Sequence, residues 1–464
     1  MTNLADSSIV EPSASAYRGD DRHAIRRDHL LEVVRANPGA KLGLRKDTSN
    51  LFRDPERTSR QRLDVRNFDH VIAVDAKAKL IVAEGMTTYE DLVAATLACG
   101  VLPPVVPELK SITLGGAAAG IGIEASSFKY GLVHESLIEF DVLTGGGRIL
   151  TCRADNEQRD LFFGFPNSYG TLGYALKLTI GAIAAKPYVE LRHRRFADAD
   201  TCFAALEQEC RGGADFIDGV AFGPGQLYLT TGRFVESAPY VSDYTFERIY
   251  YRSIREREID YLSVHDFIWR WDTDWFWCSK NVGAQVPWIR RLYGRKRLGS
   301  RTYQRVMRWN SRWRITALLN RVRGGYAESV IQDVDIPIAN APAFLSYFQR
   351  EIGIEPMWIC PLLGTESAGR FPLYPLRPHA LYVNFGFWDV LRRPTHFEAH
   401  HFNRRIEAKV AQLGGIKSLY SDSFYDRSSF DRIYGGDTYR ALKAKYDPKG
   451  DFPELYDKCV SRRS

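Results

Sequence analysis

The sequence predicts a mixed α+β protein built from two domains, and three observations support this. The chain has 464 residues, of which 45% are hydrophobic, so it can bury more than one core. Strand-like and helix-like stretches alternate along its length. Near Tyr188, short strands separated by Gly-rich turns give way to longer elements rich in aromatic residues. We therefore expect a disordered tail, a first domain, a second domain and a C-terminal segment that returns to the first, over residues 1–19, 20–186, 187–419 and 420–464.

The first domain is expected to contain short strands with recognisable turns between them. Residues 70–74 and 79–83 flank a polar turn and predict a hairpin. Residues 89–99 carry apolar residues at helical spacing, and Thr87 and Thr88 precede them as candidate caps. Further elements are expected as strands over 138–144, 148–152 and 175–183 and as a helix over 439–446.

The composition limits the cellular compartments in which the protein is expected. The seven cysteines are scattered, without a CxxC pair or zinc spacing, so we expect reduced thiols in a cytoplasmic protein. The N-terminus has no apolar signal-peptide core, and no uninterrupted apolar stretch approaches the roughly 18–20 residues that cross a bilayer. These features predict a protein that is neither secreted nor membrane-spanning. They leave open one that lies on a membrane surface.

The basic character of the chain is concentrated in residues 289–323, which contain twelve Lys or Arg and no Asp or Glu. One helical face is expected to carry four arginines with two tryptophans beside them, namely Arg301, Arg305, Arg308, Arg312, Trp309 and Trp313. This pattern is typical of a helix in an anionic membrane interface. A solvated basic face over a packed aromatic core is the alternative. We expect no nucleic-acid partner, because the stretch has no recognised binding module.

The most informative stretch is residues 107–131, PELKSITLGGAAAGIGIEASSFKYG. Small residues with free N–H groups let a backbone approach a pyrophosphate closely, and a close-packed buried turn is the alternative. Residues 120–125 formally fit the G-x-G-x-x-A dinucleotide fingerprint, with Asp141 near the acidic position. We reject a Rossmann fold, because no β-branched strand precedes the fingerprint and residues 126–131 break any helix after it.

These residues and their surroundings resemble the FAD-binding domain of the vanillyl-alcohol-oxidase (PCMH-type) superfamily. The resemblance rests on ITLGG…G.GIE.SS..YG, on a strand over 137–143, and on DLFFGFPNSYGTLGYALKLTI over 160–180. Residues 45–51 occupy the place of that family's first phosphate loop, and 82–85 its following strand. The resemblance implies a PCMH-type FAD-binding domain, with an α/β substrate (cap) domain over 187–419.

The resemblance also implies where FAD is bound. The implied contacts are Arg45, Lys46, Thr48, Ser49, Asn50, Pro107, Ser111, Thr113, Gly115, Gly116, Gly120, Gly122, Ser126, Ser127, Tyr130 and Gly131, with Gly170, Thr171 and Gly173 near the adenine. Many members attach FAD through a His in the first loop or a Cys near the second. Residues 45–53 contain no His and residues 107–131 no Cys, so we expect non-covalent FAD.

The resemblance extends to the end of the chain and favours the sterol Δ24-reductase (Diminuto/seladin) branch. It rests on VVPELKSITLGG, GIGIEASSFKYGL, PMWICPLL, HFEAHHFNRRIE, LYSDSFYDRSSFDRIYGG and FPELYDK. The TSNLFR and TYEDLVAATLACG stretches are similar to bacterial flavoenzymes that work with a fatty-acyl methyltransferase and reduce a methylene lipid to a methyl-branched one. The resemblance implies NADPH as the reductant and such a methyltransferase as a candidate partner.

Reduction of an isolated C=C bond needs an acid that protonates one carbon while reduced flavin gives a hydride to the other. The candidate catalytic residues are Lys417, Tyr420, Asp422 and Glu124. The first three lie where the chain returns to the first domain, and Lys417 is also a candidate to stabilise negative charge at flavin N1. The alternative role for Glu124 is an ion pair with Arg45 or Lys129, because an unpaired buried carboxylate is costly.

We therefore expect NADPH-driven, FAD-dependent reduction of a lipid C=C bond, with a methylene fatty acyl chain of a phospholipid as first choice. The alternatives are sterol Δ24 reduction, an alcohol or sugar oxidase or dehydrogenase, and a non-catalytic lipid-binding partner of a methyltransferase. We expect no metal. His396 and His400 lie at i, i+4, but the sequence offers no third ligand at a suitable spacing.

Overall fold

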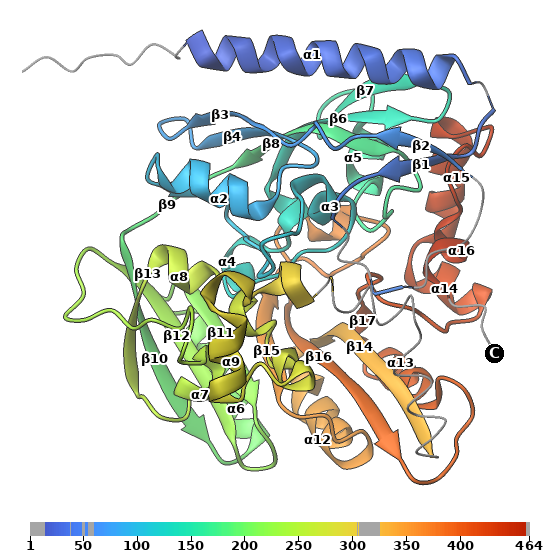
Figure 1. The fold of residues 1–464 in the computed structure, drawn as a ribbon. Coiled ribbons are helices and arrows are strands. Elements are labelled where there is room, and N and C mark those ends of the chain that lie inside the picture. Colours follow the sequence, from blue (N-terminus) through green and yellow to red (C-terminus); the bar gives the residue numbers. More distant parts are fainter. Residues whose placement is uncertain are drawn as a thin grey trace, which may run out of the picture.

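The computed structural model describes residues 14–37, 39–48, 52–53, 60–303, 305 and 325–460. Two β-sheets divide these residues into two domains, one above the other in Figure 1. The chain passes from the first to the second between β9 (Ile183–Ala184) and β10 (Tyr188–Phe196).

The first domain is centred on a five-stranded antiparallel sheet in the order β3-β4-β8-β6-β7. Its strands are β3 (Val71–Asp75), β4 (Leu80–Glu84), β6 (Leu137–Thr144), β7 (Arg148–Arg153) and β8 (Tyr174–Gly181). Two small sheets accompany it, the parallel pair β1 (Leu42–Arg45) with β2 (Gln61–Asp64) and the antiparallel pair β5 (Val101–Leu102) with β9. Its shorter helices are α2 (Tyr89–Leu97), α3 (Leu114–Ala119), α4 (Ser127–Tyr130), η1 (Val133–Ser136) and α5 (Arg159–Gly164).

The second domain is built on an eight-stranded antiparallel sheet in the order β13-β10-β12-β11-β15-β16-β14-β17. Its remaining strands are β11 (Phe216–Ala221), β12 (Leu227–Val235), β13 (Ile259–Ser263), β14 (Tyr326–Pro337), β15 (Met357–Leu363), β16 (Leu381–Arg393) and β17 (Ile416–Lys417). The helices are α6 (Ala199–Cys210), α7 (Tyr250–Ser253), α8 (Val264–Ile268), η2 (Asp272–Asp274), η3 (Cys278–Val282), α9 (Pro287–Tyr293), η4 (Arg295–Arg297), η5 (Ile338–Asn340), α12 (Ala341–Glu351), η6 (Ala368–Arg370) and α13 (His401–Gln412).

Alternate residues of this sheet pack in opposite directions, as the two-residue period of a strand requires. On β15, Met357 and Ile359 belong to a core that they share with α6, α12 and α13. Trp358 and Cys360 instead belong to a core that they share with the first domain. The sheet is thus buried on both faces, and its second face forms the boundary between the domains.

The C-terminal segment lies against the first domain. Helices α14 (Arg427–Ile433), α15 (Gly436–Tyr446) and α16 (Leu455–Cys459) lie along its side (Figure 1). Lys443 on α15 donates to the carbonyl of Thr171 at 2.7 Å. Tyr446 at the end of the same helix donates to Asp160 at 2.5 Å. The predicted helix over 439–446 is confirmed as the larger part of α15.

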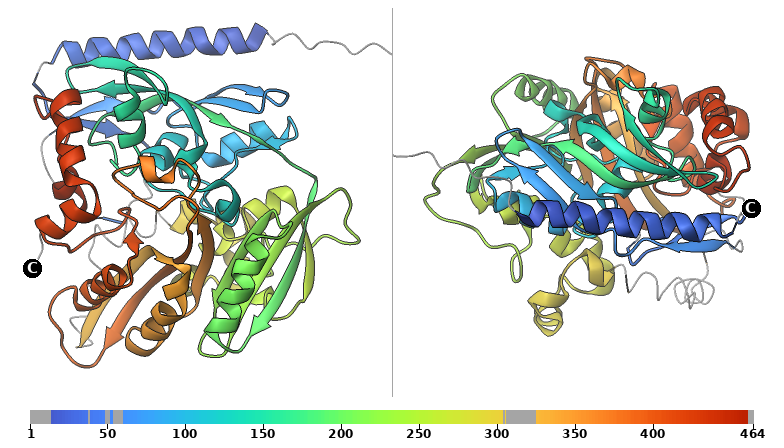
Figure 2. Two further views of the ribbon diagram at one scale, coloured as in Figure 1. Left: turned by 180° about the vertical axis from the view of Figure 1, so that it is seen from behind. Right: turned by 90° about the horizontal axis from the view of Figure 1, so that it is seen from above.

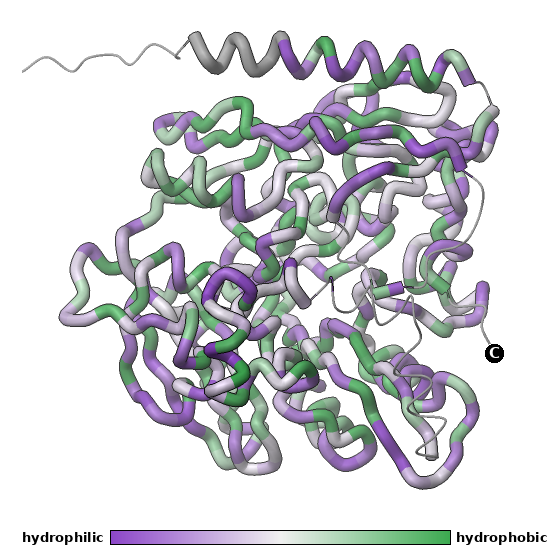
Figure 3. Tube along the Cα trace, in the orientation of Figure 1, coloured by the Kyte–Doolittle hydropathy of each residue, from purple (hydrophilic) through white to green (hydrophobic). Residues whose placement is uncertain are grey.

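Several predicted elements of the first domain are confirmed. The hairpin is β3 with β4, and the predicted helix is α2, capped by the Thr88 hydroxyl, which accepts from the N–H of Asp91 at 3.2 Å. The expected disordered tail is too long, because helix α1 (Ala14–Arg35) already begins at Ala14. This helix lies across the first domain (Figure 2), and hydrophobic and hydrophilic residues alternate along its C-terminal part, which is the part coloured in Figure 3. Residues 1–13 lie outside the described part.

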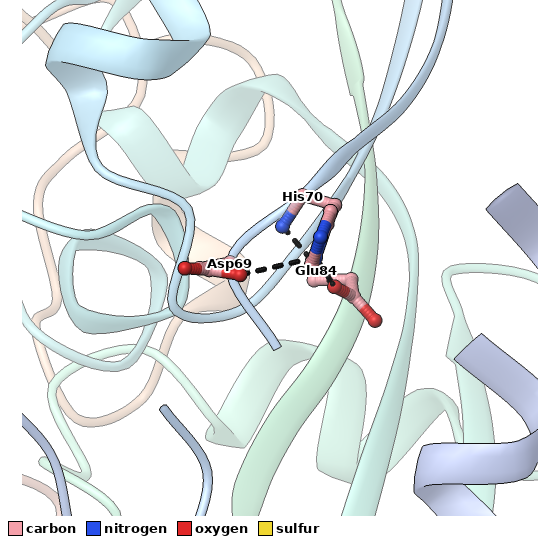
Figure 4. A group of neighbouring side chains, drawn as sticks. All are labelled: Asp69, His70 and Glu84. Carbon is pink, nitrogen blue, oxygen red and sulfur yellow. Dashed lines mark hydrogen bonds and ion pairs between the residues drawn. The ribbon is translucent and has the colours of Figure 1, made fainter. Parts of the chain in front are cut away.

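Helix α1 is attached through the buried carboxylate of Glu84 at the end of β4. His23 Nδ1 lies 2.7 Å and Arg26 Nη2 2.6 Å from Glu84 Oε1. On the other side, His70 Nδ1 lies 3.0 Å from Glu84 Oε2 and 3.0 Å from Asp69 (Figure 4). Asp69, His70 and Glu84 form the one group of metal-ligating side chains found among the described residues. Because Arg26 already neutralises Glu84, we assign the group a structural role.

Among the described helices, none has both the length and the apolar character that a membrane crossing requires.

Candidate functional site

The glycine-rich segment starts as the short helix α3 and continues to Gly120. The hydroxyl of Thr113 caps this helix by accepting from the N–H of Gly116 at 3.2 Å. A Cβ atom at Gly115 would lie 2.7 Å from the carbonyl oxygen of Gly85, to which the Gly115 N–H donates at 2.8 Å. Gly115 is therefore needed to pack α3 against the end of β4, whereas Gly116 is exposed. The same segment therefore contains one tightly packed glycine, Gly115, and one with an exposed backbone, Gly116.

A second loop, residues 167–173, lies against the end of α3. The N–H of Tyr169 donates to the carbonyl of Ala119 at 2.8 Å, and a Cβ atom at Gly120 would lie 3.2 Å from the Tyr169 ring. Gly170 has a φ of +75°, a left-handed conformation that favours glycine. The two segments that the resemblance assigns to the phosphates and to the adenine thus adjoin each other.

Two basic side chains contact Tyr169, and two more lie close enough to act on one of them. Lys458 donates to the Tyr169 carbonyl, and the Arg53 guanidinium lies 4.6 Å from the centre of the Tyr169 ring. Burial, together with the charges of Arg53, Lys46 and Arg60, lowers the pKa of Lys458 to about 7. Like charges destabilise one another in a low dielectric, and a bound polyanion relieves this. The arrangement therefore favours a ligand with phosphate groups.

Buried polar atoms without a hydrogen-bond partner in the described part of the chain gather around the same place. They are Arg53 Nη2, Asn167 Oδ1, Ser168 Oγ, Tyr169 OH and Ser421 Oγ. Each such atom costs about 1–3 kcal/mol unless a ligand or water satisfies it. The ligand is therefore expected to be polar as well as anionic.

Comparison with known protein families identifies the first domain. Residues 27–153 match the family model described as an FAD binding domain. The chain carries an FAD-binding domain.

Related proteins cover both domains. The chain is 28% identical over 422 residues to the Delta(24)-sterol reductase of Homo sapiens, which covers 86% of this chain and 77% of that protein. It is 23% identical over 457 residues to the Delta(24)-sterol reductase of Arabidopsis thaliana, over 88% of this chain and 78% of that protein. A shorter match of 30% over 179 residues joins it to cytokinin dehydrogenase 6 of Oryza sativa subsp. japonica, over 37% of this chain and 33% of that one. The chain is thus a homologue of the sterol reductases over most of its length.

FAD fits the residues of its domain. Arg53 and Lys458, beside Lys46, would hold the diphosphate, and the exposed backbone at Gly116 would face the cofactor. Arg53 and Lys458 were missed by the sequence reasoning. Lys458 ends the motif FPELYDK, one of the motifs on which the resemblance rests, but no neighbouring residue in the sequence links it to the first loop.

Several predicted cofactor contacts instead have structural partners. The Ser126 hydroxyl donates to the Pro104 carbonyl at 2.7 Å, and the Ser127 hydroxyl accepts from the N–H of Glu124 at 3.1 Å. Glycines 122, 131 and 173 lie in close packing, since a Cβ atom there would meet Val133 at 2.7 Å, Glu135 at 2.2 Å and the Leu143 carbonyl at 2.6 Å respectively. These positions are therefore needed for the packing of the loops of the FAD domain.

The other predicted contacts differ in burial. Pro107, Ser111, Thr113 and Thr171 are buried, Tyr130 is half-buried, and Arg45 lies 3.8 Å from Asp64 in an exposed pair. Thr48 is half-buried at the end of the described part of the first loop, and Ser49 and Asn50 lie outside the described residues.

A second polar centre lies at the boundary between the FAD domain and the second domain. Arg270 Nη2 lies 2.9 Å from Glu124 Oε1 and 2.7 Å from Asp218 Oδ2, and all three side chains are buried. The N–H of Ile217 donates to the carbonyl of Ala125 at 2.7 Å, which holds β11 against the FAD domain beside the pair. Glu124 is therefore paired across the domain boundary. The predicted partners, Arg45 and Lys129, are wrong.

More carboxyl groups surround this pair than it can neutralise. Burial raises the pKa of Glu108 well above its usual range, and the charge of Glu124 raises it further. Burial raises the pKa of Glu124 to about 7 in spite of Arg270. Burial and the charge of Asp335 likewise raise the pKa of Asp333 well above its usual range. One guanidinium faces several acids, so part of this cluster is protonated at neutral pH.

Tyr420 connects the acid cluster to the FAD domain. Its hydroxyl accepts from Trp388 Nε1 at 2.6 Å and hydrogen-bonds the Asp333 carboxyl, and its carbonyl accepts from the N–H of Phe52 at 3.0 Å. Burial raises the pKa of Tyr420 well above its usual range. Of the three predicted catalytic residues on the returning segment, Tyr420 is the one placed beside the acids.

Lys417 is engaged elsewhere, against the prediction of a role at the flavin. Its side chain is buried, and Nζ lies 2.8 Å from Glu407 Oε1 on α13. It also donates to the Asp422 carbonyl at 2.5 Å and to the Ser423 hydroxyl at 3.3 Å. Because Lys417 uses its three protons in these bonds, it stabilises the turn that contains Asp422.

The predicted membrane face falls largely on residues that the structure does not describe: Arg308, Trp309, Arg312 and Trp313. Arg301 is described, and its Nη2 lies 2.6 Å from Glu90 of the FAD domain. Arg305 is exposed. Arg301 therefore already has an acidic partner within the chain.

Proposed function

We propose that this protein is an FAD-dependent reductase that uses NADPH to reduce an isolated C=C bond of a lipid. A methylene fatty acyl chain of a phospholipid is the first-choice substrate. The observation that carries the proposal is the buried acid cluster of Glu108, Glu124 and Asp333 around Arg270, at the boundary between the FAD domain and the substrate domain. The homology with sterol reductases supports the same class of reaction.

An isolated alkene has no carbonyl group to make it electrophilic, so its reduction depends on a strong, well-placed proton donor. Bound FAD, once reduced, supplies the hydride, and NADPH supplies the electrons. One carbon then gains the hydride, the other gains a proton from a carboxylic acid, and the carboxylate regains its proton from water. The protein must therefore keep a carboxyl group protonated at neutral pH, away from bulk solvent.

Glu108 meets this requirement best. Its pKa is raised well above its usual range, by burial first and by the charge of Glu124 second, which favours the protonated form. Its Oε1 has no hydrogen-bond partner among the described residues, which leaves it available to a substrate. Arg270 is shared between Glu124 and Asp218, and its charge opposes the rise in the pKa of Glu124. Glu108 is the proposed proton donor, and Glu124 the group that keeps it protonated.

The surroundings suit an apolar substrate. Phe276 packs against Trp388 with ring centres 4.1 Å apart, and Trp388 donates to Tyr420 beside the acids. Trp275 stacks on Phe52 of the FAD domain at 5.8 Å. Aromatic side chains on both sides of the domain boundary would exclude water from a bound hydrocarbon chain.

A sterol with a Δ24 double bond is the second candidate, because several relatives are named Delta(24)-sterol reductases. Both substrates contain an isolated C=C bond that needs a proton donor and a hydride, and they differ in shape. A flexible acyl chain and a rigid ring system can be separated by supplying each alone.

The experiment is an anaerobic absorbance titration of the purified protein. NADPH should bleach the flavin, and the correct lipid should restore its yellow colour without oxygen. Each lipid is tested separately, as detergent-solubilised methylene phospholipid or as Δ24 sterol. Restoration by neither lipid, with rapid reoxidation and peroxide release in air, would instead identify an oxidase. Protein that takes up no FAD would contradict the proposal and leave a non-catalytic lipid-binding role.

A further inference from the structure

Helix α9 and the η4 turn after it present apolar side chains to solvent. Trp288 is 65% exposed and Leu292 is 71% exposed, and their spacing of one helical turn places them on the same face. Val286, just before the helix, is 40% exposed. Scattered single apolar residues are normal on a surface, but adjacent ones that include a tryptophan mark an interaction site.

Basic side chains flank the apolar tip that Val286, Trp288 and Leu292 form. Residues 286–300 contain five Lys or Arg and no acid. Arg290 is buried and anchors the helix, with Nη1 2.6 Å from Asp274 Oδ1. Lys296 and Arg297 are exposed on η4. A tryptophan between an apolar tip and exposed cations is the composition of a segment that binds at the headgroup level of an anionic membrane.

A second group of exposed apolar side chains lies nearby. Tyr240 is 42% exposed and Val241 is 48% exposed, and both line an open pocket of about 430 Å³. Arg295 of η4 lines the same pocket and lies 2.8 Å from Asp243. The pocket also contains Asp243 and Glu247, so the exposed apolar side chains of Tyr240 and Val241 lie in a charged region that adjoins η4 through Arg295.

The same segment is joined to the acid cluster. Ser300, just after η4, donates to Asp272 from its backbone at 3.3 Å, and Asp272 accepts from the N–H of Lys110 at 3.0 Å. Lys110 follows Glu108 by two residues. Trp275, three residues after Asp272, stacks on Phe52. Hydrogen bonds through Asp272 therefore join the segment after η4 to the segment that contains Glu108, the proposed proton donor.

We propose that α9 and η4 dock the protein on an anionic phospholipid bilayer, with Val286, Trp288 and Leu292 inserted and Lys296 and Arg297 at the headgroups. The proposal deepens the proposed function, on which it rests for the nature of the substrate drawn from the membrane. It commits to a bilayer because Lys296 and Arg297 beside the apolar tip are exposed and have no acidic partner among the described residues, so their charge complements anionic lipid, whereas Arg291 and Arg295 pair with Glu247 and Asp243.

The experiment is co-sedimentation of the FAD-loaded full chain with vesicles of saturated lipids. Vesicles of dimyristoyl phosphatidylcholine, with or without dimyristoyl phosphatidylglycerol, contain no C=C bond, so binding is independent of the reaction. The wild type should bind the anionic vesicles and not the neutral ones. The double variant Trp288→Ser, Leu292→Ser should lose at least about tenfold in partitioning, because two apolar side chains no longer leave water. The variant Lys296→Gln, Arg297→Gln should lose ~5-fold per charge.

A matched control replaces two exposed isoleucines of the FAD domain, Ile25→Ser with Ile138→Ser, and should bind like the wild type. Flavin absorbance and melting temperature check that each variant is folded. Equal binding by the wild type and the Trp288, Leu292 variant, or no binding by either, overturns the proposal. So does sedimentation velocity that shows a wild-type dimer and a monomeric variant, since the tip would then contact a second copy. Turnover of detergent-solubilised lipid by the same variant tests the proposed function separately.

Discussion

Glu124 of the FAD domain and Arg270 of the second domain form a buried ion pair at 2.9 Å across the boundary between the two domains. Arg270 also holds Asp218 at 2.7 Å. The pair therefore joins the two domains and sets the charge of the candidate proton donors. Arg270 itself is held by the Phe267 carbonyl at 3.0 Å and packs on the Phe267 ring at 4.2 Å. Its position is thus fixed by the second domain before the substrate arrives.

The substitution Glu108→Gln is expected to abolish lipid reduction while leaving the flavin intact. The amide keeps the size of the side chain but cannot give up a proton, so turnover should fall by about 10²–10⁴-fold, the usual contribution of a general acid. Flavin bleaching by NADPH should be unchanged, because that step does not use the acid. Stopped-flow absorbance measures both steps in one sample. The control Glu139→Gln removes a carboxyl group that pairs with Arg153 at 3.5 Å, far from the cluster, and should keep full activity. A Glu108→Gln enzyme with normal turnover would remove Glu108 from the mechanism.

The substitution Arg270→Met should destabilise the protein strongly. It leaves the carboxyl groups of Glu124 and Asp218 buried without a cation, which costs about 3–5 kcal/mol in comparable cases. Urea denaturation followed by fluorescence measures the free energy of unfolding. As control, Arg211→Met breaks a pair with Glu207 whose side chains are 76% and 41% exposed, and should cost less than about 1 kcal/mol. Equal losses in the two variants would show that the buried pair contributes no more than a surface pair.

The free energy of unfolding should depend on pH through Glu124. The pKa of this carboxyl is raised from 4.5 to about 7 in the folded protein, chiefly by burial. Between these values the folded protein keeps a proton that the unfolded chain has released, so stability is lost as the pH rises from about 4.5 to about 7. The loss is on the order of 3 kcal/mol. This contribution is absent in Glu124→Gln. The free energy of unfolding of the variant, measured by urea titration, should therefore rise relative to that of the wild type between pH 5 and pH 8. Parallel pH profiles for the two proteins would contradict the shift.

The sequence predicted those parts of the site that local pattern and motif order determine. Thr88 caps α2 because a hydroxyl before a helix satisfies a free N–H, and such a cap can be read from a few residues. The ordered series of glycine motifs likewise located the FAD domain, which the family match at residues 27–153 supports. Both features depend on neighbours in the sequence.

The acid cluster could not be predicted in the same way. Arg270 lies in an aromatic stretch whose pattern predicts core packing and no polar site. It meets Glu124 only because β11 docks against the FAD domain. Lys417 shows the converse. Its place on the returning segment favoured a role at the flavin, but the fold of α13 puts Glu407 2.8 Å away and occupies it. Which charged groups meet is decided by tertiary packing.

The substitution Glu84→Gln should loosen helix α1 from the FAD domain. Glu84 holds His23 and Arg26 at 2.7 and 2.6 Å, and hydrogen bonds to a charged group contribute about 1.5–3 kcal/mol each. Brief trypsin digestion should therefore cut after Arg26 or Arg27 about tenfold faster in the variant. The control Glu32→Gln alters an exposed residue on α1 that pairs with His29 at 3.8 Å, and should be cut like the wild type. Unchanged cleavage of Glu84→Gln would mean that apolar packing alone holds α1.

Binding of FAD should be coupled to protonation of Lys458. In the cofactor-free protein, burial and then the charges of Arg53, Lys46 and Arg60 lower the pKa of this amine to about 7, so it is largely neutral at pH 8. A diphosphate beside it favours the charged form, and binding at pH 8 should take up about one proton. FAD affinity should accordingly fall as the pH rises above about 7. Titration calorimetry in two buffers of different ionisation enthalpy measures the uptake.

Lys458→Met should bind FAD more weakly and take up no proton. The control Lys445→Met, which removes an exposed partner of Asp160, should match the wild type in both. Equal proton uptake by the Lys458 variant and the wild type would place the diphosphate away from Lys458.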